Sequence, residues 1–326
     1  SNTTGSANVA VGRIALTTNT TGSNNVAIGC CALKSNTTAA NNTAVGMNSL
    51  ATNTTGTENT SMSRDSLSSN TTGNCNVGVG YRSLKSNTEG NGNVAIGYHA
   101  LCTNTTASVN TAVGFCAMES NTTGGSNTAL GTNTLQANTT GTDNTAVGRS
   151  AMVKTTTGLC NTAMGGNTMA CNTTGCYNSA FGRDALCANT TADNNTAVGV
   201  SALKVNTEGN YNTAVGRLAL YENTTASNNT AVGLSALEKT TTGADNTAIG
   251  ANALDANTTG CRNVAVGVGS LGTNTTAANN AAIGYGALFT NTTGADNTAM
   301  GSCALNKNTT GNDNTAVGKC AAACNT

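Results

Sequence analysis

Cysteine is the residue type in this chain best equipped for chemistry, and thirteen cysteines are spread along its 326 residues. Their spacing fits no CxxC metal knuckle, so a structural zinc site is not expected. Cys303 and Cys320 stand 17 residues apart. In a chain that repeats with that period they would lie about one strand spacing, ~4.8 Å, from each other, which a disulfide can bridge. We therefore take Cys303 and Cys320 as the candidate disulfide.

The histidine and the acidic residues do not form a pattern typical of an acid–base catalytic site or a metal site. His99 is the only histidine, which excludes sites with several histidine ligands and disfavours a histidine-based triad. It stands beside Tyr98, and we expect it to be a solvated surface residue. The 14 acidic residues are scattered, and no phosphate-binding loop or glycine-rich calcium repeat is present. The sequence predicts no enzyme, no catalytic residue, no metal and no cofactor.

The tripeptide Asn-Thr-Thr recurs fifteen times, and each copy is formally an acceptor sequence for N-glycosylation. In an extended strand, the Asn and the second Thr would also share one face, and their repetition would form a flat polar lattice like the Thr arrays of ice-binding solenoids. Glu89 and Glu208 replace the second Thr, and Thr155 and Thr240 replace the Asn, which favours a structural role. The candidate glycan or ice face comprises Asn19, Thr21, Asn36, Thr38, Asn53 and Thr55.

All these residues are placed by a 17-residue repeat that runs from Asn2 to Cys324, nineteen times without insertion or deletion. We number its positions 1 to 17 from Asn2. Position 2 is always Thr, position 7 is always Asn, and position 10 is always a large apolar residue. Because a strict short repeat brings each copy against its neighbours in sequence, we predict one uninterrupted array over residues 1–326.

Each copy is too short and too often interrupted by glycine for a helix. Gly at position 11 and Gly or Ala at position 4 leave short β-prone pieces such as TAV or VAI at positions 8 to 10. We predict an all-β fold, a parallel β-solenoid of 19 coils of 17 residues, in which each strand pairs with its equivalents one coil away. At ~4.8 Å per coil, the array would be roughly 90 Å long.

Three columns of equivalent residues are assigned from this pattern. The Asn at position 7 is predicted to form an internal ladder, with the members Asn8, Asn25, Asn42, Asn144 and Asn314. Large apolar residues at positions 10 and 15 are predicted to form the core, with the members Val11, Ile28, Leu33, Val215 and Leu220. Strand alternation then turns position 9 outward, as a candidate oligomer face of Ala10, Ala27, Ala44 and Ala112. The alternative is that position 9 faces a bend and is buried within its own coil.

The motifs NVAIG (25–29) and NTAVG (42–46, 144–148, 314–318), each followed by AL or SL, resemble the head repeats of YadA-like trimeric autotransporter adhesins. They also look like the NTTG and NTAIG arrays of tail-fibre-like proteins from phages and marine bacteria. The resemblance implies a left-handed parallel β-roll that trimerises. The adhesin repeat is shorter, so the additional NTT segment here is expected to form a third side of the coil.

These observations favour a structural fibre, extracellular or on a cell or virion surface, with an adhesive role as an extension. Ice binding and a glycan-bearing surface filament are the alternatives. The expected partner is another copy of the chain, in a trimer or an end-to-end filament, with a cell-surface glycan or other surface ligand as a further candidate. Balanced charge, 14 basic against 14 acidic residues, argues against nucleic acid. No apolar run approaches the roughly 20 residues of a membrane span, so membrane insertion is not expected.

Overall fold

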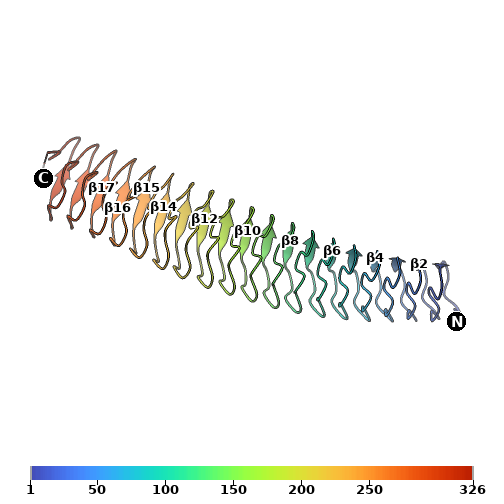
Figure 1. Ribbon diagram of the computed structural model, residues 1–326. Coiled ribbons are helices and arrows are strands. Elements are labelled where there is room, and N and C mark those ends of the chain that lie inside the picture. Colours follow the sequence, from blue (N-terminus) through green and yellow to red (C-terminus); the bar gives the residue numbers. More distant parts are fainter. Residues whose placement is uncertain (1, 325–326) are drawn as a thin grey trace. The chain divides into compact units, whose positions relative to one another are not determined.

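The computed structural model describes residues 2–324, which group into two compact units, residues 2–161 and 162–324. Each unit is a parallel β-solenoid built of 17-residue coils, and no helix occurs within residues 2–324 (Figure 1). Every coil contributes one strand of three residues, at positions 8 to 10. The fold class predicted from the repeat is therefore confirmed.

The strands follow one another at the period of the repeat. In the first unit they are β1 (Val9–Val11), β2 (Val26–Ile28), β3 (Thr43–Val45), β4 (Thr60–Met62), β5 (Val77–Val79), β6 (Val94–Ile96), β7 (Thr111–Val113), β8 (Thr128–Leu130) and β9 (Thr145–Val147). In the second unit they are β10 (Thr162–Met164), β11 (Ser179–Phe181), β12 (Thr196–Val198), β13 (Thr213–Val215), β14 (Thr230–Val232), β15 (Thr247–Ile249), β16 (Val264–Val266), β17 (Ala281–Ile283), β18 (Thr298–Met300) and β19 (Thr315–Val317).

Within each unit, neighbouring strands pair in parallel without any shift in register. In the pair β2–β3, for example, Ala27 lies opposite Ala44 and Ile28 lies opposite Val45. The same pairing of equivalent positions holds between β12 and β13. Each repeat position therefore forms a column, and a residue's main neighbours are its own equivalents one coil away.

Left-handed backbone conformations close each coil. Gly29, at position 11, has a φ of 130°, and a Cβ there would lie 2.6 Å from the carbonyl oxygen of Gly46 in the next coil. Glycine is required on both counts. Positions 6, 13 and 15 are also left-handed, as at Asn24 (φ 58°), Cys31 (φ 62°) and Leu33 (φ 47°). The frequent Asn and Asp at positions 6 and 13 suit this conformation, which short polar side chains tolerate best.

The interior of the coil is narrow, and its apolar part holds positions 9, 14 and 15. Leu33 and Leu220, at position 15, are fully buried as predicted. Ala27, Ala44 and Ala112, at position 9, are fully buried as well, so the outward Ala face predicted from the sequence was wrong. The alternative, burial within the coil, is the observed arrangement. Ala10 belongs to the first coil, which has a neighbour on one side only in the structure, and it is exposed.

The assignment of position 10 to the core was also wrong. Val11, Ile28 and Val215 are 56%, 38% and 36% exposed, and they point away from the interior. The physical reason is space, because the inward side chain of each strand packs against positions 14 and 15 of the preceding coil: a Cβ on Gly78 would lie 2.6 Å from Oγ of Ser66 and 3.3 Å from Cδ1 of Leu67. Only a small residue fits there, so strand alternation turns the large one outward.

This reversal predicts losses of stability of very different size for two adjacent substitutions. We expect Ala214→Asp to lower the free energy of unfolding by at least about 3 kcal/mol, because a carboxylate would be buried without a partner. Val215→Asp should cost only about 1 kcal/mol, the scale of β-propensity at an exposed strand position. Urea denaturation followed by circular dichroism, at dilute protein concentration, measures both. Equal losses would contradict the assignment of inside and outside.

Ser63 is the one position-11 residue that is not glycine. Its φ of 122° lies in the region that only glycine adopts without strain. Nearby, β4 and β5 carry Ser61 and Gly78 at position 9 in place of Ala. The hydroxyl of Ser61 lies 2.6 Å from that of Ser49 and donates to the carbonyl of Ser66 at 2.8 Å, so this part of the interior is polar. The fourth coil thus combines backbone strain with a reduced apolar core.

We expect Ser63→Gly to stabilise the protein by about 1 kcal/mol or more, because it removes a left-handed strain of about 1–3 kcal/mol. The control is Ser68→Gly, five residues along the same coil, where φ is not left-handed. That change should be neutral or destabilising, since it only increases the freedom of the unfolded chain. Thermal unfolding of the two variants beside the parent chain makes the comparison, and a loss of stability in Ser63→Gly would refute the account.

Candidate functional surfaces

The Asn at position 7 forms the predicted ladder. The backbone N–H of Asn42 donates to Oδ1 of Asn25 at 3.0 Å, and Nδ2 of Asn42 donates to the carbonyl of Gly56 at 2.9 Å. The same bonds recur at Asn144 and, in the other unit, the backbone N–H of Asn314 donates to Oδ1 of Asn297. One Asn residue therefore joins three successive coils, through its backbone N–H on one side and its side-chain amide on the other. Its role is structural, because both ends of the side chain are used inside the protein.

The Asn at position 1 forms a second buried ladder, which sequence reasoning missed. Nδ2 of Asn36 donates to Oδ1 of Asn19 at 2.9 Å and to the carbonyl of Ala39 at 2.9 Å. Asn19, Asn36 and Asn53 are fully buried. A glycan on such a nitrogen would displace these bonds and could not leave the narrow interior. The sequons at these residues are therefore structural elements of the folded coil.

The threonines of positions 2 and 3 have different environments. At position 2 the hydroxyl donates to the carbonyl of the same position one coil on, as from Thr37 to Thr54 at 3.1 Å. This ladder explains why position 2 is invariant. At position 3, the side chains of Thr21, Thr38 and Thr55 are exposed. The predicted flat lattice of Asn and Thr does not form, because its Asn rank is inside the coil.

The thirteen cysteines lie at variable positions, and none of them forms a disulfide within residues 2–324. Cys303 is half-buried and Cys320 is exposed, both at position 13 of neighbouring coils. The candidate disulfide between them is not formed. Their backbones stack in register, so the geometry that motivated the prediction is present without the covalent bond.

A cluster of aromatic and charged side chains covers coils four to eight of the first unit. Tyr81, Tyr98 and Phe115 occupy position 12 of three successive coils, and the rings of Tyr98 and Phe115 are stacked with centroids 5.1 Å apart. The guanidinium of Arg64 lies 4.5 Å from the Tyr81 centroid. These three rings form a row on the outside of the solenoid. The row arises because equivalent positions of successive coils stack, so aromatic residues at the same position become neighbours.

His99 belongs to this cluster and is not the solvated residue expected from the sequence. Its ring stacks on Tyr98 with centroids 4.2 Å apart, and its Nδ1 lies 3.0 Å from Oε1 of Glu119. The amide of Gln136 donates to the other oxygen of Glu119 at 3.0 Å. Burial opposes ionisation of this carboxyl, yet these hydrogen bonds hold the pKa of Glu119 below its ordinary value. Cys116 lies against the same carboxylate, and burial, reinforced by the charge of Glu119, raises the pKa of its thiol to about 11.

The most extended feature of either unit is a column of large apolar side chains at position 10, which we call the position-10 stripe. Its members differ in size from Val to Phe, and none is fully buried. No charged residue occurs at position 8 or 10, the two outward positions of the strand, whereas position 12 beyond it carries several Arg. The stripe consists of Val11, Ile28, Val45, Met62, Val79, Ile96, Val113, Leu130 and Val147 in the first unit, and Met164, Phe181, Val198, Val215, Val232, Ile249, Val266, Ile283, Met300 and Val317 in the second.

A signal for this stripe was present in the sequence. An interior site of fixed volume does not tolerate exchange between Val and Phe, because cores are close-packed and overpacking is destabilising. Position 9, by contrast, is only Ala, Ser or Gly. The interior position of this strand, position 9, is therefore recognised by the small size of its side chains and not by their apolar character.

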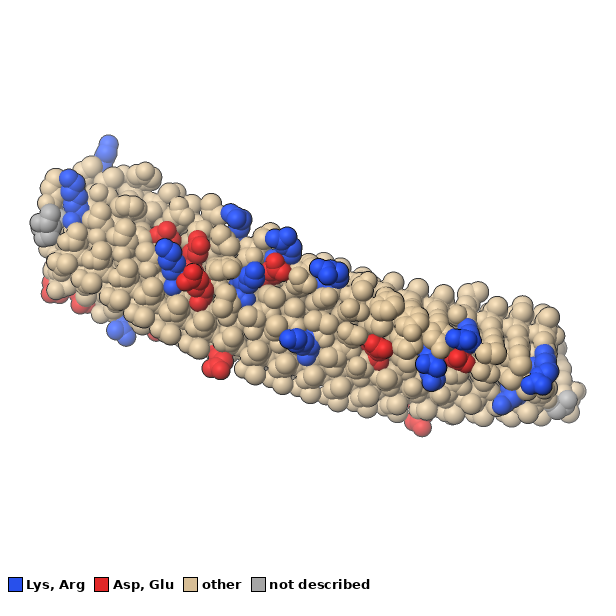
Figure 2. Space-filling view, in the orientation of Figure 1, with Lys and Arg blue, Asp and Glu red and all other residues tan. Residues whose placement is uncertain are grey.

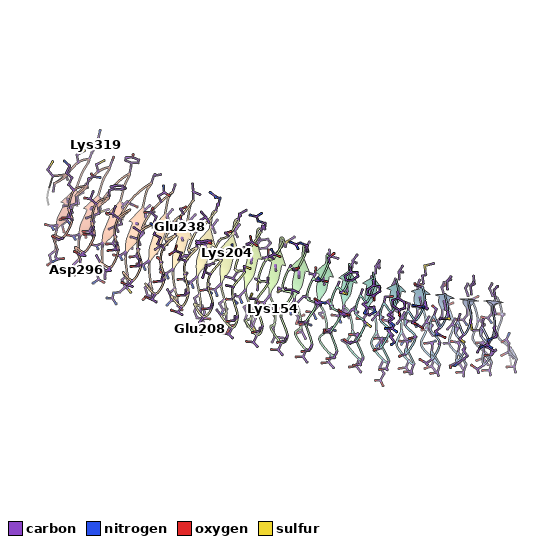
Figure 3. The ribbon with its side chains drawn as sticks, viewed as in Figure 1. Lys154, Lys204, Glu208, Glu238, Asp296 and Lys319 are labelled. Carbon is purple, nitrogen blue, oxygen red and sulfur yellow. The ribbon has the colours of Figure 1, made fainter. Side chains whose placement is uncertain are left out.

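Charged side chains are sparse on the remaining surface. Figure 2 shows Lys and Arg interspersed with Asp and Glu over the visible face, with neither sign gathered into a large patch. In the second unit, Lys204, Glu208 and Glu238 point away from the coil interior (Figure 3). Such an arrangement provides no extended field of one sign.

No family model matches the chain, and no curated protein matches it either. Between residues 2 and 324, no three His, Cys, Asp or Glu side chains converge where they could hold a metal ion. The same residues include no helix with the length and apolarity that a membrane span requires.

The raised pKa of Cys116 predicts an unusual pH dependence of its alkylation. Because the thiolate is the nucleophile, the rate of reaction with iodoacetamide should keep rising until the pH approaches about 11. Glu119→Gln should move this midpoint to lower pH, since it removes a negative charge that disfavours the thiolate. Timed labelling with peptide mass spectrometry measures Cys116 separately from the other cysteines.

Glu89→Gln is the matched control, because it removes one carboxylate at position 3, outside the cluster. It should leave the midpoint for Cys116 unchanged. Rapid alkylation of Cys116 near pH 8 in the parent chain, or the same midpoint in Glu119→Gln, would show that the cluster does not control this thiol.

Proposed function

We propose that this protein is a structural fibre protein whose β-solenoid units associate with further copies of the chain through the position-10 stripe. The observation that carries the proposal is the stripe itself, a column of outward Val, Ile, Leu, Met and Phe in every coil of both units. Exposed apolar surfaces of this extent are typical of interaction sites. A partner that covers the stripe would remove these side chains from water.

The proportions of the stripe favour another copy of the chain as that partner. Nine coils at ~4.8 Å and a face ~10 Å wide give roughly 400 Å² in the first unit, the size of the largest apolar patch on a typical monomer, which is often functional. The ten coils of the second unit give roughly 480 Å² on the same reckoning, and each partner of a standard interface contributes roughly 800 Å². A second copy has the same coil spacing, so its side chains can interdigitate with the stripe coil by coil. The absence of charge at positions 8 and 10 leaves no like-charge repulsion to overcome.

The resemblance of the NTAVG motif to YadA-like head repeats supports placing such a fibre outside a cell or on a virion, and supports a trimer as its assembly. The structure lacks the exposed Asn residues on which the two alternative functions, ice binding and a glycan-bearing filament, were based. Ice binding relied on an exposed rank of Asn beside Thr, and the glycan-bearing filament relied on accessible Asn at position 1. Since Asn19, Asn36 and Asn53 are fully buried, neither alternative is proposed further.

The test is self-association measured by light scattering and sedimentation over a range of protein concentrations. We expect the parent chain to be oligomeric at micromolar concentration. The double variant Ile96→Lys with Leu130→Lys introduces two charges into the stripe and should weaken association at least about 100-fold, because each charge would be desolvated at an apolar interface.

The matched control is Thr106→Lys with Thr140→Lys, two exposed residues at position 3 of coils in the same unit. Glu89 and Glu208 occupy this position in other coils, so a charge is compatible with the fold there. The control should associate like the parent chain. A parent chain that remains monomeric at 100-fold higher concentration, or equal effects of the two double variants, would refute the proposal.

A further inference from the structure

The second unit has a surface hollow that the repeat does not explain. It has a volume of ≈ 290 Å³ and is lined by Asn252, Val268, Gly269, Tyr285, Gly286, Phe289 and Asn306. These residues stand at positions 12, 13 and 16 of four successive coils. Gly269 and Gly286 are the two glycines at position 13 of the whole chain, and they are neighbours.

The backbone does not require these glycines. Gly269 and Gly286 have φ values of 64° and 58°, and Asn252 and Leu218 adopt 53° and 61° at the same position. A Cβ at Gly286 would lie 3.5 Å from Nδ2 of Asn306, which is an ordinary contact. Since the fold accepts a side chain here, what the two glycines provide is the open space itself.

A third glycine makes room for an aromatic ring beside this space. A Cβ on Gly272, at position 16, would lie 2.9 Å from the ring of Phe289, and a Cβ on Gly269 would lie 3.5 Å from it. The Phe289 ring therefore lies back over the preceding coil, with 42% of the residue exposed. Tyr285 projects beside the hollow and is 66% exposed. Two aromatic side chains thus border a space that is open to solvent.

The polar groups at the hollow are amides and backbone carbonyls. Nδ2 of Asn306 donates to the carbonyl of Gly286 at 2.8 Å, which holds this side chain at the rim with its oxygen as a further acceptor. Asn252 is exposed at the other end, and the Tyr285 hydroxyl can donate and accept. No charged residue lines the hollow.

We propose that this hollow binds one neutral sugar ring of a glycan. A pyranose has an apolar C–H face that packs on an aromatic ring and a rim of hydroxyls that both donate and accept hydrogen bonds. Phe289 and Tyr285 match the first feature, and Asn252 and Asn306 match the second. A volume near 300 Å³ is at the lower limit of ligand pockets, as suits a single ring. The lack of charge in the lining disfavours anionic sugars and phosphorylated ligands.

The site is separate from the self-association surface. Its residues stand at positions 12, 13 and 16, whereas the position-10 stripe and its flank occupy positions 8 and 10. The inference therefore does not rest on the proposed fibre, and failure of one does not entail failure of the other. In a fibre, however, the same hollow would recur once in every copy, and multivalency would raise a weak affinity.

The chain contains only three phenylalanines, Phe115, Phe181 and Phe289, which makes ¹⁹F NMR of the fluorophenylalanine-labelled full chain a direct test. The probes are methyl glycosides of glucose, galactose and mannose, and N-acetylglucosamine, each titrated to about 50 mM. We expect at least one of them to shift the Phe289 resonance with a dissociation constant of about 1–10 mM, the range for a ligand of about a dozen heavy atoms. Phe115 and Phe181, both exposed on other surfaces, should not shift.

Gly286→Asn fills the hollow while keeping a residue type that position 13 carries in other coils, and it should weaken binding at least about tenfold. Ser150→Asn introduces the same side chain at position 13 of another coil and should leave binding unchanged. No shift at Phe289 with any probe, equal shifts at all three resonances, or unchanged binding in Gly286→Asn would overturn the proposal. A Phe289 chemical shift that changes with protein concentration in the absence of sugar, while that of Phe115 stays constant, would overturn it too, because another chain would then occupy the hollow.

Discussion

Parallel stacking without a register shift is the constraint on which the rest of this structure depends. Each strand meets the same strand of the next coil, so every position of the repeat is surrounded by copies of itself. A residue is acceptable only if it can lie one strand spacing from its own equivalent. Asn satisfies this inside the coil by donating in one direction and accepting in the other, and Thr does so at position 2. Insertions would break every column at once, which accounts for the unvarying period.

The narrow interior follows from the short coil. With one strand of three residues and left-handed corners at positions 6, 11, 13 and 15, the coil encloses one Leu or Met, two small residues and the two Asn side chains of positions 1 and 7. Apolar burial per coil is therefore modest, and the buried Asn ladders supply hydrogen bonds that a thicker core would not need. The coil is least stabilised at the fourth and fifth repeats. Backbone strain at Ser63 occurs there beside Ser61 and Gly78, which replace the apolar Ala of position 9.

Surface chemistry is confined to the positions that stacking leaves free to vary. At positions 12, 13 and 16, successive coils can be given different side chains without disturbing a column. The Tyr98–His99–Glu119 cluster in the first unit and the glycine-lined hollow beside Phe289 in the second are both built this way. The position-10 stripe is the opposite case, a surface that recurs in every coil. Recurrent columns suit assembly along a repeating partner, and local departures from the repeat suit recognition of a single ligand.

The sequence by itself determined the fold class, the period, the parallel pairing of equivalent strands and the Asn ladder at position 7, because each follows from a repeat without insertions. It did not decide which side of the strand faces inward. Strand alternation requires positions 9 and 10 to face opposite sides, but it does not say which of them faces inward. Only the width of the closed coil places Ala27 inside and Ile28 outside. The burial of Asn19 and the positions of His99 and Phe289 were likewise decided by tertiary structure. Each depends on how the corners bend and on side chains one coil away, which a pattern read along the chain does not contain.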